Sequence, residues 1–156
     1  MFSALPMPQF DWNEKNMRYA LCAFPLVGVV CGALWCVCGV LPLPAAARAA
    51  GFCLVPVWVT GGIHLDGYAD TCDALSSYGD TAKKLEILKD PHCGAFAVIY
   101  GGVYLLAYAG FAYEVFAAGH ILLICPLFVL SRALSGLCAV NLPNARKSGM
   151  LCAFTS

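Results

Sequence analysis

Long apolar runs separated by short polar segments dominate the chain. A helix of about 20 mostly apolar residues crosses the roughly 30 Å hydrocarbon core of a bilayer. The pattern predicts an all-α, polytopic membrane helical bundle of about four transmembrane helices, which forms a single integral-membrane domain over residues 1–156. The predicted spans are residues 19–40, about 45–62, about 95–113 and about 117–140.

Composition agrees with this pattern. Of the 156 residues, 61% are hydrophobic and 12% are charged, whereas soluble domains average roughly 45–50% and about 25%. A water-soluble monomer of this length cannot bury so much apolar surface. The 9 basic and 9 acidic residues balance, which argues against nucleic acid as a partner and leaves the lipid bilayer as the expected surroundings.

Small residues are placed within the apolar runs. Most of the ten cysteines lie there, where cysteine behaves as a small hydrophobe, so we expect them to be packing residues. Gly28 and Gly32 form a small-xxx-small face. Such a face lets helices approach closely, within one chain or in a homo-oligomer.

Basic residues indicate the orientation in the membrane. With four spans, both chain ends and the polar segment 66–94 share one side. Most lysines and arginines lie on that side, and Arg48 lies on the other. The positive-inside rule therefore predicts that the polar segment is cytoplasmic. The basic residues on that side are Lys15, Arg18, Lys83, Lys84, Lys89, Arg146 and Lys147.

Acidic residues concentrate in this polar segment. Asp66, Asp70 and Asp73 are spaced i, i+4, i+7, which places them on one face of a helix. Like charges at this spacing repel, so local folding does not favour the arrangement, whereas a bound divalent cation does. Carboxylate oxygens suit Mg²⁺, Mn²⁺ or Ca²⁺. The alternative is a solvated acidic segment without a metal.

Three further polar features are candidates for chemistry. His64 precedes the aspartates. It is a general base, a hydrogen-bond donor to a phosphate, or a hydrogen-bonded histidine at the start of a helix. In a formed helix it points away from the aspartate face. Arg132 is a charge within the fourth span and therefore a functional candidate. The lysines after Asp80 belong either to an interfacial helix or to a phosphate site.

One sequence motif identifies a family. The string GGIHLDGYADTCDAL, followed by EILKD and a glycine at position 94, resembles cobalamin synthase, the adenosylcobinamide-GDP ribazoletransferase family. The family pattern is G-G-x-H-x-D-G-x-x-D-x-x-D and then E-I-(M/L)-(K/R)-D-x-x-x-G. Leu5-Pro6-Met7-Pro8, Phe24-Pro25-Leu26-Val27-Gly28 and Ser131-Arg132 resemble other family segments, so the resemblance covers nearly the whole chain.

The resemblance implies a reaction. It is Mg²⁺-dependent phosphoryl transfer in the bacterial cytoplasmic (inner) membrane, which joins α-ribazole or its 5′-phosphate to adenosylcobinamide-GDP. The products are adenosylcobalamin, or its 5′-phosphate, and GMP. The implied roles are metal binding by Asp66, Asp70 and Asp73, substrate binding by Gly61, Gly62, Lys89 and Arg132, and catalysis by His64 and Asp90.

Three alternatives stay open. Family members are longer and carry a second motif, G-D-x-x-G-A-x-x-E, which this sequence lacks, so the first alternative is an inactive or partial form of the enzyme. CDP-alcohol phosphotransferases also place aspartates on a helix, but their D-G-x-x-A-R pattern differs here after Ala69. A non-enzymatic membrane protein, such as a transporter subunit, is the third alternative.

Overall fold

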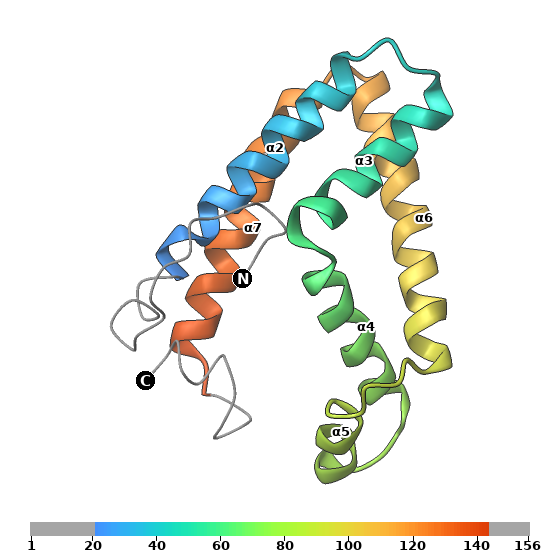
Figure 1. Cartoon of the computed structure of the whole chain (residues 1–156), viewed down its shortest axis with the longest axis vertical. Coiled ribbons are helices and arrows are strands. Elements are labelled where there is room, and N and C mark those ends of the chain that lie inside the picture. Colours follow the sequence, from blue (N-terminus) through green and yellow to red (C-terminus); the bar gives the residue numbers. More distant parts are fainter. Residues whose placement is uncertain (1–20, 144–156) are drawn as a thin grey trace.

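Every secondary-structure element in the described part of the chain is a helix. The structure is a computed structural model, and it describes residues 21–143. Within this range there is no strand, which confirms the predicted all-α membrane bundle (Figure 1). The elements are η1 (Leu21–Ala23), α2 (Phe24–Val40), α3 (Ala45–Thr60), α4 (Ile63–Ser76), α5 (Thr81–Ile87), α6 (Ala95–Ala117) and α7 (Ile121–Asn141).

Three helices are long and apolar enough to cross a membrane alone. They are Leu21–Val40, Ala95–Ala117 and Ile121–Asn141, which confirms three of the four predicted spans. The second predicted span needs correction. With 16 residues, α3 rises about 24 Å, which is shorter than a bilayer core of about 30 Å. It qualifies only together with α4, from which it is bent by 96°.

Two glycines make this bend. Gly61 and Gly62 both adopt left-handed backbone conformations, with φ values of 64° and 78°, which residues with a Cβ rarely accept. The Gly62 amide donates to the Val57 carbonyl at 2.9 Å and thereby closes the end of α3. A new helix starts in a different direction at Ile63, so the acidic motif begins at the break itself.

The small-residue face of α2 is used inside the chain. A Cβ added to Gly28 would lie 2.6 Å from the Phe128 carbonyl oxygen, and one added to Gly32 would lie 3.2 Å from that of Cys125. The backbones of α2 and α7 therefore touch, as small residues in membrane helices permit. The expected close approach is confirmed, and its partner is α7.

Aromatic rings fill the contact between α2 and α3. Trp35 and Phe52 are completely buried, and their rings stack with centroids 4.2 Å apart. Nearby, the Arg48 guanidinium lies 4.2 Å from the Phe116 ring centre and donates to the carbonyls of Leu41 and Leu43. This core fixes the end of the bundle at which α2 turns into α3.

The acidic helix packs along α6. The rings of Tyr68 on α4 and Tyr104 on α6 lie 5.4 Å apart, and Asp73 contacts the start of α6. Because α6 is itself a candidate span, α4 lies beside the first half of a span. From the sequence alone, the acidic segment is instead predicted to lie beyond the end of a span.

Candidate functional site: two faces of α4

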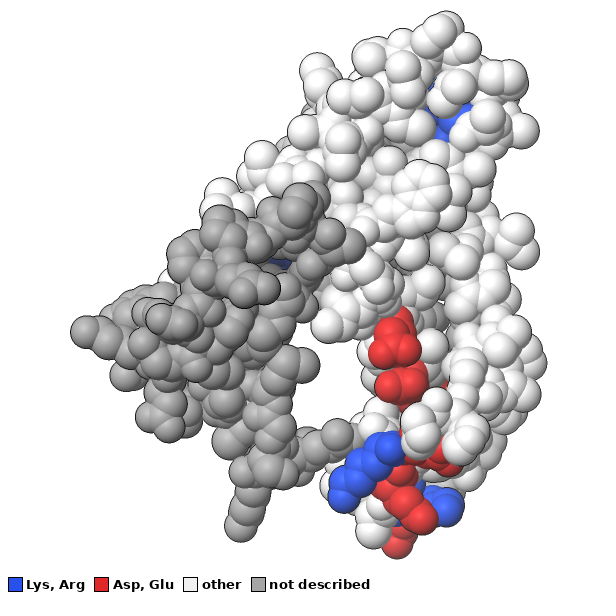
Figure 2. Space-filling view, in the orientation of Figure 1, with Lys and Arg blue, Asp and Glu red and all other residues white. Residues whose placement is uncertain are grey.

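All three predicted metal ligands lie on one helix. Asp66, Asp70 and Asp73 belong to α4, so the predicted helical spacing is confirmed. Asp66 is exposed, and the other two are half-buried. Figure 2 shows acidic side chains gathered over the α4 and α5 end of the molecule, with basic side chains beside them. We refer to the side of α4 that bears these three residues as the acidic face.

Asp73 has a defined structural partner. One of its carboxylate oxygens accepts the Gly94 amide at 2.7 Å, and the other accepts the Ala97 amide at 2.8 Å. These are donors of the first turn of α6, which lack intrahelical partners. A carboxylate is also stabilised at the N-terminus of a helix, where the helix dipole is positive. Asp73 thus caps α6 and ties it to α4.

The acidic face has carboxylates that could hold a magnesium ion whose remaining ligands are water and substrate. Mg²⁺ usually takes one or two protein carboxylates and completes its shell with water and substrate phosphates. Asp66 and Asp70 lie one helical turn apart and match that donor set. Across residues 21–143, no group of three Asp, Glu, His or Cys side chains is close enough to enclose an ion.

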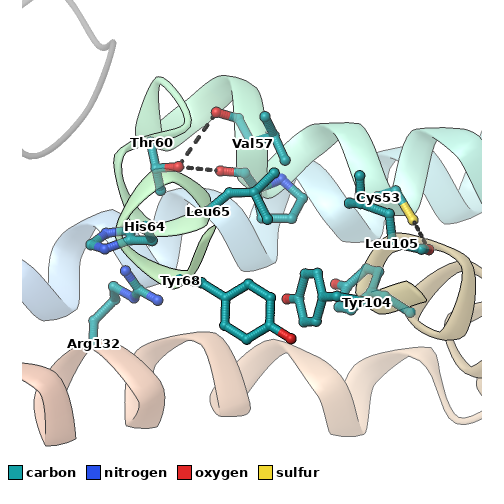
Figure 3. Close-up of a pocket in the computed structure, with 11 residues that line it drawn as sticks. Cys53, Val57, Thr60, His64, Leu65, Tyr68, Tyr104, Leu105 and Arg132 are labelled. Atoms are coloured by element: carbon teal, nitrogen blue, oxygen red, sulfur yellow. Dashed lines mark hydrogen bonds between the residues drawn. The ribbon is translucent and has the colours of Figure 1, made fainter. Parts of the chain in front are cut away.

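His64 and Arg132 lie at a second place, a cavity between α3, α4, α6 and α7. At 100° per residue, His64 lies about 160° around α4 from Asp66, so it points away from the acidic face, as predicted. Its ring lies 5.7 Å from that of Phe24, and the Arg132 guanidinium lies 5.9 Å from the same ring. Figure 3 shows Arg132 directed toward His64. Both residues border a cavity of about 230 Å³.

This cavity combines an apolar wall with a few polar groups. The Nε2 atom of His64 and the Nη1 atom of Arg132 are buried, and neither has a hydrogen-bond partner in the described structure. Such orphaned groups are uncommon and call for an explanation. The lining residues are Cys53, Pro56, Val57, Thr60, His64, Leu65, Tyr68, Tyr104, Leu105, Tyr108 and Arg132.

The tyrosines of this cavity were not predicted from the sequence. Tyr104 and Tyr108 line it from α6, and Tyr68 lines it from α4. A signal was present, because Tyr100, Tyr104 and Tyr108 recur at i, i+4, i+8 and such residues share a helix face. Their spacing did not show which helix they would meet.

Lys89 and Asp90 lie in the exposed turn after α5. Asp80 caps α5, since its side chain accepts the Lys83 amide. Asp90 accepts both the His92 amide, at 2.9 Å, and a hydrogen bond with the His92 ring. These bonds from His92 lower the pKa of the Asp90 carboxyl below its ordinary value, so Asp90 is ionised at neutral pH.

The structure therefore divides the predicted residues into groups. His64 and Arg132 share the cavity, whereas Asp90 belongs to the segment that leads from α5 into α6. The two candidate catalytic residues therefore lie on different segments, because His64 is in the first turn of α4 and Asp90 lies beyond the end of α5. Gly61 and Gly62, predicted to bind substrate, have a conformational role at the bend.

Comparison with known proteins gives a consistent result. A family model described as Cobalamin-5-phosphate synthase matches residues 1–156. An adenosylcobinamide-GDP ribazoletransferase of Lachnoclostridium phytofermentans is 44% identical over 99% of this chain and 60% of its own length. A protein of the same name from Clostridium perfringens is 40% identical over 72% of this chain and 45% of its own length. Another, from Acinetobacter baumannii, is 32% identical over 88% of this chain and 56% of its own length.

No solved structure matches the chain. The chain spans about half to 60% of the length of these curated relatives. The family model nevertheless extends over every residue of it, and the acidic motif lies within the matched range. The chain therefore belongs to the cobalamin-5-phosphate synthase family.

Proposed function

We propose that the chain takes part in Mg²⁺-dependent phosphoryl transfer, in which α-ribazole or its 5′-phosphate is joined to adenosylcobinamide-GDP and GMP leaves. The observation that carries this proposal is the acidic face of α4 within a chain of this family. Phosphoryl transfer depends on positioning and charge neutralisation, with little covalent chemistry from the protein. A carboxylate face beside a span is suited to that task.

Asp66 and Asp70 would hold the magnesium ion. When bound, it neutralises charge on the pyrophosphate that is split during the reaction. Asp73, the third predicted ligand, contributes by anchoring α4 to α6 through two backbone amides. Anchoring holds the other two carboxylates in place beside the first half of α6.

The remaining predicted residues divide between binding and proton transfer. Lys89 is an exposed cation near the α5–α6 connection and would balance phosphate charge. His64 faces away from the carboxylates, which favours a substrate-binding role. Asp90 is already ionised at neutral pH and is the candidate to receive the proton of the attacking hydroxyl, although its lowered pKa makes it a weak base.

The acidic face is proposed to lie on the cytoplasmic side of a bacterial inner membrane. Lys83, Lys84 and Lys89 accompany it, whereas Arg48 lies at the opposite end of the bundle. Cys93 is exposed in the α5–α6 connection. A membrane-impermeant maleimide should therefore label Cys93 in inverted membrane vesicles and leave it unlabelled in intact cells, with Cys93→Ser as the control.

The test of the reaction is GMP release in membranes that contain the chain. Adenosylcobinamide-GDP and α-ribazole are supplied with and without Mg²⁺. We expect Mg²⁺-dependent release, reduced about 100-fold or more by Asp70→Asn or Asp66→Asn and unchanged by Cys36→Ser. A parallel assay with a chain extended to the length of the relatives shows whether this part suffices. Release of CMP from a CDP-alcohol instead would contradict the proposal.

A further inference from the structure

The cavity between α3, α4, α6 and α7 contains three buried polar atoms without a hydrogen-bond partner in the described structure, namely Nη1 of Arg132, Nε2 of His64 and the hydroxyl of Tyr108. Arg132 lies midway along α7, and a charged side chain within a span needs a partner. Within residues 21–143, its Nη2 atom donates to the Ser131 hydroxyl at 3.4 Å, and its Nη1 atom has no hydrogen-bond partner. His64 brings a second buried, unpaired nitrogen to the same cavity.

The lining also lacks a carboxylate. None of the described residues that border the cavity is Asp or Glu, so the guanidinium has no acidic partner there. An arginine fork combined with a ring nitrogen is suited to an anion with several oxygens, such as a phosphate. The unsatisfied groups therefore indicate an anionic ligand.

Aromatic rings extend from this anion position. Tyr68 and Tyr104 have ring centres 5.4 Å apart, and those of Tyr104 and Tyr108 are 6.0 Å apart. These are the separations at which flat rings stack or meet at an angle. An adjoining cavity of about 320 Å³ shares Arg132, Tyr104 and Tyr108, which brings the space into the range of small-molecule sites.

The chemistry of the lining distinguishes between flat bases. Guanine presents several donors and acceptors along its edge, and a selective site for it needs matching polar side chains. Among the described lining residues there is no Asn, Gln, Asp or Glu, so no side-chain carboxylate or amide oxygen is present to accept a hydrogen bond from the edge of guanine. An apolar two-ring base of the benzimidazole type fits this lining better than guanine.

We propose that this cavity binds the acceptor nucleoside of the reaction in its phosphorylated form, with Arg132 and His64 on its 5′-phosphate and the tyrosines of α4 and α6 against its base. This inference rests on the proposed function. The cavity side of α4 lies opposite the acidic face, so a phosphate held there is not the one that is split. Arg132 and His64 are thus specificity-determining residues for a phosphate that survives the reaction.

The test is equilibrium binding to the purified chain in lipid nanodiscs, without Mg²⁺ or the GDP substrate. The probes are α-ribazole 5′-phosphate, α-ribazole and GMP. We expect the phosphorylated nucleoside to bind most tightly. Arg132→Gln should weaken its binding about 10- to 100-fold and leave α-ribazole nearly unaffected. Tyr104→Leu should weaken both ribazole compounds about 2- to 10-fold, and Tyr104→Phe neither.

Matched controls are available elsewhere in the bundle. Arg48 is also an arginine beside an aromatic ring, and Tyr113 on α6 packs against Phe116. Neither Arg48 nor Tyr113 lines the cavity. Arg48→Gln and Tyr113→Leu should retain wild-type affinity. Where Arg132→Gln does not yield folded protein, Arg132→Lys keeps the charge, loses the two-pronged contact and should show a smaller loss of the same selectivity.

The outcomes separate this inference from the proposed function. If the wild type releases GMP but Arg132→Gln weakens both ribazole compounds equally, the phosphate site is wrong and the reaction stands. If phosphate selectivity depends on Arg132 but no GMP is released, the site is supported and the reaction is not. Absence of wild-type binding, or GMP binding as tight as that of α-ribazole 5′-phosphate, overturns the inference.

Discussion

Removing the Asp73 carboxylate should destabilise the fold whether or not magnesium is present. This residue joins α4 to α6 by accepting the Gly94 and Ala97 amides at 2.7 and 2.8 Å. Asp73→Asn keeps one acceptor oxygen but turns its NH₂ group toward the second amide. Asp73→Ala removes both acceptors and leaves the Ala97 amide unpaired in a residue that is only 3% exposed.

The expected loss follows from these two bonds. Loss of a helix cap costs about 0.5–2 kcal/mol, and an unsatisfied buried donor costs about 1–3 kcal/mol. We expect Asp73→Asn to lower the free energy of unfolding by about 1–2 kcal/mol, and Asp73→Ala by about 2–4 kcal/mol. For a chain of this size, 1 kcal/mol corresponds to roughly 2–4 °C in the unfolding midpoint.

Thermal unfolding in detergent, with and without Mg²⁺, measures this effect. Asp66→Asn is the matched control, because Asp66 is an exposed carboxylate of the same face and should leave the midpoint unchanged without Mg²⁺. Gly94→Ala perturbs the same contact from the other side, since its Cβ would lie 2.6 Å from both Asp73 oxygens. The losses from Gly94→Ala and Asp73→Ala should combine to less than their sum.

Two results would refute this reasoning. One is an Asp73→Asn midpoint equal to that of the wild type in the absence of Mg²⁺. The other is full additivity of Gly94→Ala and Asp73→Ala, which would mean that the two substitutions disturb different contacts. Either result would mean that Asp73 does not stabilise the fold as a cap of α6, and its predicted role as a metal ligand would remain.

Two further predictions concern the α2–α7 contact. Gly28→Ala should lower the unfolding midpoint, because its Cβ would lie 2.6 Å from a backbone oxygen of α7, whereas Gly102→Ala, in open space on α6, should not. The thiol sulfurs of Cys36 and Cys125 lie 2.8 Å apart, so copper phenanthroline should oxidise them to a disulfide that links α2 to α7. After proteolysis between these helices, gel electrophoresis should show one cross-linked fragment for the wild type and two separate fragments for Cys36→Ser. A wild type that gives separate fragments would contradict the packing of α2 against α7.

Much of the helical framework could be predicted from local sequence. The three independent spans follow from hydrophobicity alone. The contact face at Gly28 and the shared face of Asp66 and Asp70 follow from helical periodicity. The orientation of His64 away from the aspartates follows from the same geometry. The shared helix faces depend on residues less than two helical turns apart, and the spans depend on continuous runs of apolar sequence.

The features that could not be predicted depend on contacts between distant segments. Asp73 caps α6 by accepting the amide of Gly94, which lies 21 residues later, and no local pattern distinguishes a capping aspartate from a metal-binding one. His64 and Arg132 are 68 positions apart and meet only because the chain bends by 96° at Gly61 and Gly62. The two glycines are visible in the sequence, but the direction in which the chain bends between α3 and α4 could not be predicted from them.

Arg132 also bears on how the protein is made. An arginine at the centre of a transmembrane helix opposes insertion by about 2.5–3.5 kcal/mol, and Arg132 lies midway along α7. The surfaces that receive it, the Phe24 ring and the His64 side of the cavity, belong to segments that the ribosome synthesises earlier. The order of synthesis thus provides a protein surface for the arginine before α7 leaves the translocon for lipid.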